Sequence, residues 1–218
     1  MSPRRLSPSQ RGFSLIVVLL LLVVATVLGV GAAQVSLVNE RSARNDRDAE
    51  VAFQGAEAAL VDAETDVLGP NENARQRLCL FNRSDATAFV AGCGGDGEQQ
   101  GLCAPAEPGA DPAWVSVDLS AGSGKSVAYG TFTGQTYFSG DAATGSQAGA
   151  LPARAPRYIV EAVRSRGSWQ ANVLQSASAQ DASYIFRVTA VGYGMREETQ
   201  VVLQTTLYKP AASLGCPS

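Results

Sequence analysis

Residues 13–33, FSLIVVLLLLVVATVLGVGAA, decide the fold. They form a run of 21 residues without a charge, and 14 of them are Phe, Leu, Ile or Val. A helix of this length spans roughly 31 Å, enough to cross the hydrocarbon core of a bilayer. Arg4, Arg5 and Arg11 precede the run, whereas acidic and basic residues are mixed in the segment 40–50 that follows it. Under the positive-inside rule the N-terminus lies in the cytoplasm, and the chain after the run lies outside the inner membrane.

Three kinds of N-terminal segment share this hydropathy. A secretory signal peptide has an apolar core of about 7–15 residues before a small-residue cleavage site. Gly31-Ala32-Ala33 has the composition of such a site, but the apolar run is too long for that core. An uncleaved signal anchor and a segment that is cleaved ahead of its apolar run fit the hydropathy equally well. The junction Arg11-Gly12-Phe13-Ser14-Leu15 separates them, because the charged leader ends in Gly and the apolar run begins at once with Phe.

The helix is predicted to continue well past the apolar run. Residues 34–68 contain no Pro and a single Gly, and they are rich in Ala, Glu and Arg, which are good helix formers. Spacings of three and four predict one apolar stripe, formed by Phe53, Ala56, Leu60, Ala63 and Val67. We expect Asp46 and Asp48 to lie on a solvated face. The acidic side chains as a group should lie mostly on faces other than the stripe: Asp46, Asp48, Glu50, Glu57, Asp62, Glu64 and Asp66. Gly69-Pro70 ends the helix, since Pro lacks the amide and Gly accepts a left-handed C-terminal conformation.

The rest of the chain divides into a loop-rich part and a strand-rich part. Residues 69–155 hold 14 Gly in 87 residues, with only short apolar runs between them. Residues 157–163, 183–193 and 199–208 are rich in Val, Ile, Thr, Tyr and Phe and alternate in polarity, which predicts strands. Gly192 to Glu197 has the composition of the turn between the last two strands. An antiparallel meander packed on the amphipathic half of the helix is an α+β arrangement.

Four cysteines lie in the part predicted to be outside the cytoplasm. Thiols in that environment indicate two disulfides, for which three connectivities are possible. We expect Cys93 to pair with Cys103, because this bridge closes a short Gly-rich loop. Cys79 and Cys216 would then tie the segment after the helix to the C-terminus. A zinc site is disfavoured by the 13- and 9-residue gaps between ligands and by the absence of His.

Composition excludes several classes of function. The chain has no His, which removes the commonest general base and the Ser-His-Asp arrangement. A formal charge of −3 and a pI near 5.0 argue against nucleic-acid binding, which needs a basic face. We therefore expect a protein that is not an enzyme, with no catalytic residue, no cofactor and no metal.

The junction at Gly12 and Phe13 resembles the cleavage site of type IV prepilins. The resemblance implies that a prepilin peptidase cuts after Gly12 on the cytoplasmic side and N-methylates Phe13. Further segments are similar to PilX-type minor pilins: 39–41, 45–48, 52–60, 63–64, 156–161, 186–190, 192–194 and 202–204. The implied fold is the type IV pilin fold, with a long N-terminal helix packed on an antiparallel sheet. The implied division is a leader peptide (1–12), the long helix (13–68, with 13–33 crossing the membrane), a loop-rich variable region (69–156), and the strands with the C-terminal tail of the periplasmic domain (157–218).

One position departs from the usual pilin pattern. Most pilins carry Glu five residues into the mature chain, where it is thought to neutralise a neighbouring subunit's methylated amine, and this chain has Val17 there. A carboxylate inside a membrane is costly unless it finds a partner. The resemblance and the missing Glu imply a minor pilin that primes pilus assembly in a minor-pilin complex and remains at the tip on the cell surface. The implied partners are other minor pilins, the major pilin, a pilus-tip adhesin, the assembly platform and the prepilin peptidase.

Two other classes of function remain open on the sequence. A minor pseudopilin of a type II secretion system shares the helix, the junction and the missing Glu, and differs in whether its loss abolishes secretion or surface pili. A membrane-anchored periplasmic enzyme or binding module would need carboxylates clustered in a pocket.

Overall fold

A computed structural model describes residues 13–107, 109–120, 123–138, 151–165 and 183–209. Its first element is the long helix α1 (Phe13–Leu68), which ends one residue before Gly69-Pro70. The chain divides into two compact units, Met1–Asp46 and Arg47–Ser218, and each is described by itself. In the first unit the described residues are all part of α1.

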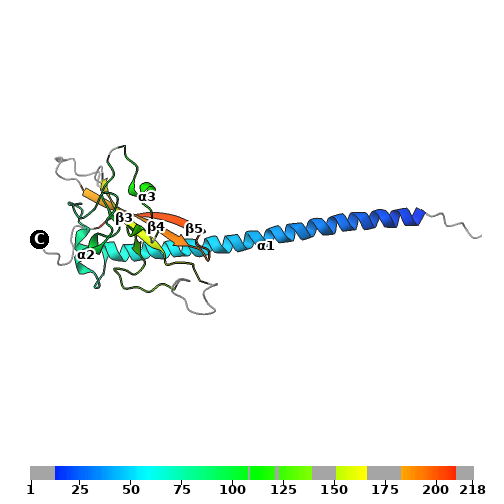
Figure 1. Cartoon of the computed structure of the whole chain (residues 1–218), viewed down its shortest axis with the longest axis horizontal. Helices are drawn as coiled ribbons and strands as arrows, with labels where there is room; N and C mark the ends of the chain where they lie inside the picture. Colours follow the sequence, from blue (N-terminus) through cyan, green and yellow to red (C-terminus); the bar gives the residue numbers. More distant parts are fainter. Residues whose placement is uncertain (1–12, 108, 121–122, 139–150, 166–182, 210–218) are drawn as a thin grey trace, which may run out of the picture. The chain divides into compact units, whose positions relative to one another are not determined.

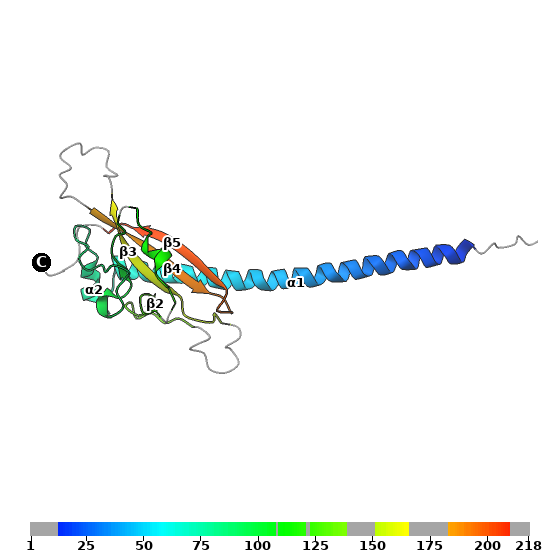
Figure 2. The same cartoon turned by 45° about the horizontal axis from the view of Figure 1, so that its top comes forward.

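The second unit combines the last part of α1 with a sheet and short loop elements (Figure 1). The elements after α1 are α2 (Arg75–Leu80), the 3-10 turn η1 (Gly97–Gln99), β1 (Leu102–Cys103), α3 (Ala113–Ser116), β2 (Val127–Ala128), β3 (Arg157–Ser165), β4 (Ser183–Tyr193) and β5 (Gln200–Leu207). The strand order is β1-β3-β4-β5, and β2 also pairs with β3. The three long strands run antiparallel and lie side by side (Figure 2), which confirms the predicted meander. The two-residue strands β1 and β2 come from the segment predicted to be loop-rich, and β1 joins β3 in parallel.

The inner face of the sheet forms the main core with α1. Alternate residues of β3 and β4 point to this face, and Tyr158, Val160, Phe186, Val188 and Ala190 are fully buried. They pack with the buried helix residues Ala59, Ala63 and Val67. Phe81 and Phe89 extend the core: their ring centroids lie 5.6 and 5.7 Å from that of Phe186. A strand face of alternating apolar residues thus finds its partner in the helix, as the α+β interpretation predicts.

The helix face that packs on the sheet is rotated from the predicted stripe. Ala52, Ala56, Ala59, Ala63 and Val67 are fully buried, whereas Phe53 is 39% exposed and Leu60 is only partly buried. The stripe prediction was wrong at Phe53, whereas the partly buried Leu60 packs against the core as predicted. The contact here is between backbones, and small side chains permit it.

Gly192 on β4 shows how close this approach is. A Cβ atom built on Gly192 would lie 2.0 Å from the carbonyl oxygen of Ala52 and 2.3 Å from the amide nitrogen of Ala56. No side chain fits at that distance. Gly192 therefore fixes where the helix crosses the sheet.

Candidate assembly interface

The first unit presents an almost continuous apolar helix surface. The large apolar side chains from Leu15 to Val38 are between 41% and 73% exposed. An 18-residue window of this helix has a mean hydropathy of 3.0, and none of the window is buried. In length and composition the helix is sufficient to cross a membrane. Since exposed apolar surface of this size is unfavourable in water, the segment requires a membrane or other subunits around it.

The predicted processing site lies at the N-terminal end of the described residues. Phe13 is the first residue of α1, and Gly12 lies outside the described residues. Cleavage after Gly12 and methylation of Phe13 therefore stay predictions. Val17, the position without the usual Glu, lies in α1 and is 41% exposed.

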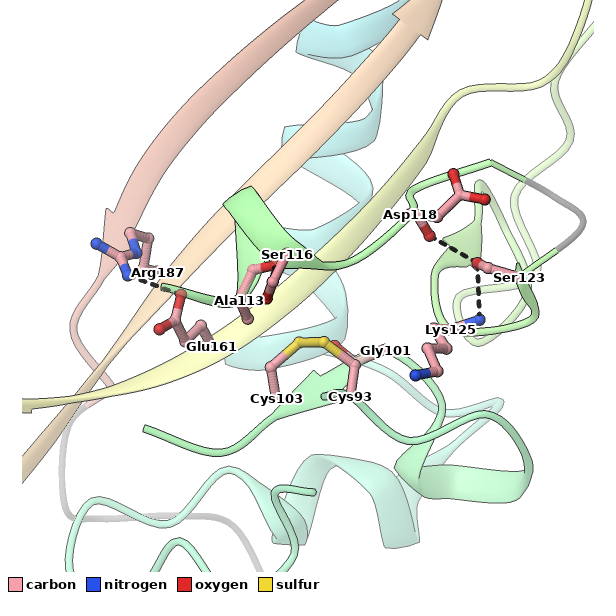
Figure 3. Close-up of a disulfide and its surroundings, with 10 residues drawn as sticks. All are labelled: Cys93, Gly101, Cys103, Ala113, Ser116, Asp118, Ser123, Lys125, Glu161 and Arg187. Atoms are coloured by element: carbon pink, nitrogen blue, oxygen red, sulfur yellow. Dashed lines mark hydrogen bonds and ion pairs between the residues drawn. A yellow bond between two sulfur atoms is a disulfide. The ribbon is translucent and has the colours of Figure 1, made fainter. Parts of the chain in front are cut away.

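The predicted bridge between Cys93 and Cys103 is present, with sulfur atoms 1.99 Å apart (Figure 3). The bridge closes a loop in which Cys93 has a φ of 66°, a left-handed conformation that is uncommon for a non-glycine residue. Both cysteines are buried with Ala113 of α3 and Ile159 of β3 in a second cluster on the outer face of the sheet. The disulfide therefore fastens a covering layer onto that face.

Of the second predicted bridge, the structure describes only Cys79. Cys79 is not a free thiol and lies in α2. Cys216 lies outside the described residues, so the pairing of Cys79 with Cys216 stays a prediction.

Three aspartates of α1 are buried and hold the sheet and its loops, and the prediction that Asp48 lies on a solvated face was wrong. Asp48 is 2% exposed and accepts hydrogen bonds from the β4–β5 turn: from the Met195 amide at 2.5 Å, the Arg196 guanidinium at 2.9 Å and the Thr199 hydroxyl at 2.6 Å. Burial alone would raise the pKa of Asp48, but the hydrogen bonds from Thr199, Arg196 and Met195 outweigh it and the pKa lies below its usual value. The turn thus binds this carboxylate in its ionised form.

Asp62 fastens a second segment to the helix. Its carboxylate is 2% exposed and accepts a hydrogen bond from the Gly130 amide at 2.9 Å and another from the Thr133 hydroxyl. Burial raises the pKa of Asp62, and the two hydrogen bonds oppose that shift. The loop after β2 is thereby held against α1.

Asp66 lies at the centre of a fully buried ion pair. Its carboxylate oxygens are 2.8 and 3.0 Å from Nε of Arg77, and both side chains have zero exposure. The Tyr158 hydroxyl donates a further hydrogen bond to Asp66 at 3.0 Å. The guanidinium of Arg77 stacks over the Phe132 ring, 3.6 Å from its centroid. Burial raises the pKa of Asp66, and the charge of Arg77 opposes that shift.

Lys209 closes the unit at the end of β5. It is 6% exposed and donates a hydrogen bond to the Leu78 carbonyl of α2 at 2.6 Å. Burial lowers the pKa of Lys209 to about 8, and the nearby Asp66 carboxylate opposes that shift. The end of the last strand is therefore tied to the segment that follows α1.

The buried aspartates carried a signal in the sequence. Asp62 and Asp66 are four residues apart, and Asp48 precedes Asp62 by 14 residues, close to four helical turns. All three therefore lie on one flank of the helix, next to the alanine stripe. Charges recurring in phase with small residues indicate bonds to a neighbouring element.

The described residues contain no group of three or more His, Cys, Asp or Glu side chains placed to hold a metal ion. One cavity of about 190 Å³ lies on the outer face of the sheet between Pro105, Val163 and Arg187. Its carboxylate, Glu161, is 2% exposed and bonds to Arg187 at 2.7 Å (Figure 3). The buried carboxylates of this part of the chain are thus occupied by structural contacts.

An exposed apolar helix segment, and a separate unit in which the same helix packs on an antiparallel sheet, together define a subunit of the type IV pilin class. The chain belongs to the PilX family of type IV pilus proteins. The family model described as the PilX N-terminal region matches residues 11–61, and that of the C-terminal region of type IV pilus assembly protein PilX matches residues 99–209. No curated protein and no solved structure matches the chain.

Family membership gives the coarse function. The chain is a minor pilin of the type IV pilus, a structural component of the fibre that interacts with other pilus components during assembly. Its apolar helix fits a membrane-anchored pilin. The pilus description of the family also favours a pilus over the secretion pseudopilus considered from the sequence.

Proposed function

We propose that this minor pilin primes pilus assembly as part of a minor-pilin complex and remains at the fibre tip. The observation that carries the proposal is Val17, at the position where most pilins have Glu. In a shaft subunit that carboxylate meets the methylated amine of a neighbour. A subunit that starts the fibre has no such neighbour.

The energetics of a membrane helix support this reasoning. A carboxylate inside a bilayer is costly unless it finds a partner, and the cost on insertion scales reaches about 2.5–3.5 kcal/mol at the middle and is lower toward the ends of the span. Val17 is 41% exposed, and the other large apolar side chains from Leu15 to Val38 are exposed as well. A subunit without a neighbour at this position avoids the cost by carrying Val.

The proposal includes processing, orientation and partners. A prepilin peptidase removes residues 1–12 and methylates Phe13, the N-terminus faces the cytoplasm, and the globular unit lies in the periplasm until assembly carries it to the cell surface. The partners are other minor pilins, the major pilin, a pilus-tip adhesin and the assembly platform. The exposed apolar side chains from Leu15 to Val38 support packing against neighbouring subunits.

The test is Val17→Glu in the native cell. We expect surface pili to stay at the same number or to fall slightly, and the amount of this protein per amount of major pilin in sheared fibres to stay unchanged. Val18→Glu is the matched control, because it adds the same carboxylate at the adjacent, 59% exposed position. More fibres, or incorporation along the shaft with Val17→Glu alone, would show that a neighbour's amine is present there and would overturn the tip location.

The mass of the mature protein tests the processing step separately. Purification from membranes should yield a chain that begins with N-methylated Phe13. A chain that begins at Gln34 or at Met1 would contradict the prepilin pathway.

A further inference from the structure

The two edges of the sheet differ in length and in whether other segments cover them. At one edge, β1 is two residues long, its Cys103 forms a parallel bridge with Val90, and the disulfide to Cys93 secures it. At the other edge, β5 is eight residues long, and within the described residues no strand pairs with its outer side. The long edge is therefore the open one.

The register shows which backbone groups the open edge presents. The Gly194 amide donates to the Thr199 carbonyl at 2.8 Å, so this pair is hydrogen-bonded. In an antiparallel ladder such pairs alternate, and Val201, Leu203, Thr205 and Leu207 are the β5 residues that bond to β4. The N–H and C=O groups that point away from the sheet are consequently those of Gln200, Val202, Gln204 and Thr206.

The side chains of this edge leave it accessible. The strand reads QVVLQTTL, with no charged residue and no proline, and its eight pairs with β4 run without a bulge. Charges, prolines and bulges are the means by which proteins block strand addition at a sheet edge. Val202 is 51% exposed on the outer face, and Val201 and Leu203 on the inner face are only half-buried.

We propose that the outer edge of β5 binds an extended segment of another pilus protein, which adds to the sheet as a further strand. The backbone groups of Gln200 to Thr206 supply the hydrogen bonds. The added segment is uncharged over about five residues, with apolar side chains toward the half-buried Val201 and Leu203 and polar ones toward Gln204. The inference rests on membership of the pilus family and holds whether or not the subunit lies at the tip.

A second copy of this chain that pairs antiparallel through β5 does not suit the site. Two copies paired antiparallel through β5 would be related by a two-fold axis normal to the sheet. That axis would make the two α1 helices run in opposite directions where each packs on its sheet. Neighbouring subunits of a filament are related by a repeated head-to-tail step that keeps their direction, so this two-fold arrangement does not suit them.

The test uses a photocrosslinking amino acid, p-benzoylphenylalanine, in the full-length protein in membranes of piliated cells. Placed at Val202 or Gln204, it should give one adduct with another pilus protein, mapped by mass spectrometry to an uncharged extended segment. Placed at Val115 of α3, which is 54% exposed, it should not give that adduct.

An edge-blocking variant supplies the second measurement. Val202→Pro removes an N–H that points away from β4, so the β4–β5 ladder and the fold are retained. With the crosslinker at Gln204, Val202→Pro should lower the adduct at least ten-fold, whereas Val202→Ala should leave it unchanged. An intact disulfide and an unchanged near-ultraviolet circular dichroism spectrum check that the Pro variant is folded.

Four results would overturn the proposal. These are an adduct with twice the mass of this chain, a crosslink to the chain's own segments 166–182 or 210–218, no adduct from either edge position, and an undiminished adduct in a folded Val202→Pro variant. None of these readouts depends on the number of pili or on the tip location, so failure of the strand-addition proposal is separable from failure of the priming proposal.

Discussion

The two parts of helix α1 differ in the size and in the exposure of their side chains. From Leu15 to Val38 the helix carries large side chains and exposes them, and the large apolar residues there are at least 41% exposed. From Arg47 to Leu68 the positions that contact the sheet are mostly Ala, and the aspartates beside them are buried. Along one helix, large apolar side chains are therefore exposed in the first part and small ones are buried in the second.

This difference shows what each part contacts. Large exposed side chains suit lipid tails or neighbouring subunit helices, where area of contact determines stability. Alanines suit a helix whose backbone must approach another backbone, as it does at Gly192. Aspartates beside that contact supply directional bonds to loops, which apolar contacts cannot do.

Breaking the ion pair of the buried part should have the largest effect. Arg77→Met leaves the Asp66 carboxylate buried without its cation, and removing one member of a buried pair costs about 3–5 kcal/mol. We expect the free energy of unfolding of the protein in detergent micelles to fall by that amount, measured with denaturant and near-ultraviolet circular dichroism. A loss below about 1 kcal/mol would contradict the structural role of the pair.

The exposed part of the helix offers the matched control. Arg44 pairs with Glu40 at 2.5 Å, but the two side chains are 77% and 58% exposed. Arg44→Met should change the free energy of unfolding by no more than about 0.5 kcal/mol. The double variant Asp66→Asn with Arg77→Met should recover part of the loss, because no unpaired charge remains buried.

A methyl group at Gly192 should have the next largest effect. Gly192→Ala places a carbon 2.0 Å from the Ala52 carbonyl oxygen and pushes the helix from the sheet. Overpacking of this kind costs about 1–3 kcal/mol, and we expect a loss in that range in the same unfolding measurement. Gly29→Ala is the control in the apolar part, where nothing lies within 4 Å of the added methyl. Equal effects of the two variants would show that the close contact at Gly192 is not required.

Local patterns made much of this structure predictable from the sequence. The apolar run, the end of the helix before Gly69-Pro70, the three long strands and the bridge from Cys93 to Cys103 each depend on neighbouring residues. The short strands β1 and β2 were not predicted, because a strand of two residues shows no periodicity in the sequence.

The burial of the aspartates went unpredicted for a different reason. A charged residue on a helix is usually solvated, so the default expectation failed wherever a distant segment supplied the partner. The hydroxyls that bond to Asp48 and Asp62 belong to Thr199 and Thr133, 151 and 71 residues further along the chain. Only the recurrence of Asp in phase with Ala indicated such contacts, and the partners themselves could not be named.

The smallest expected effect is a pH dependence of stability that arises from Lys209. This cation is buried, unlike the solvent-exposed cations of the first part of α1. The pKa of Lys209 falls from about 10.5 in an unfolded chain to about 8 in the folded one. Between these values the unfolded state binds the proton more tightly, so the free energy of unfolding rises as the pH increases above 8. Tyr158 lies in the same core, and burial raises its pKa well above the usual value, which opposes the gain at higher pH. We therefore expect stability to increase from pH 8 to about pH 9.5 in the parent protein, and this slope to disappear in Lys209→Met. A slope that persists in Lys209→Met would show that another group titrates between pH 8 and about 9.5.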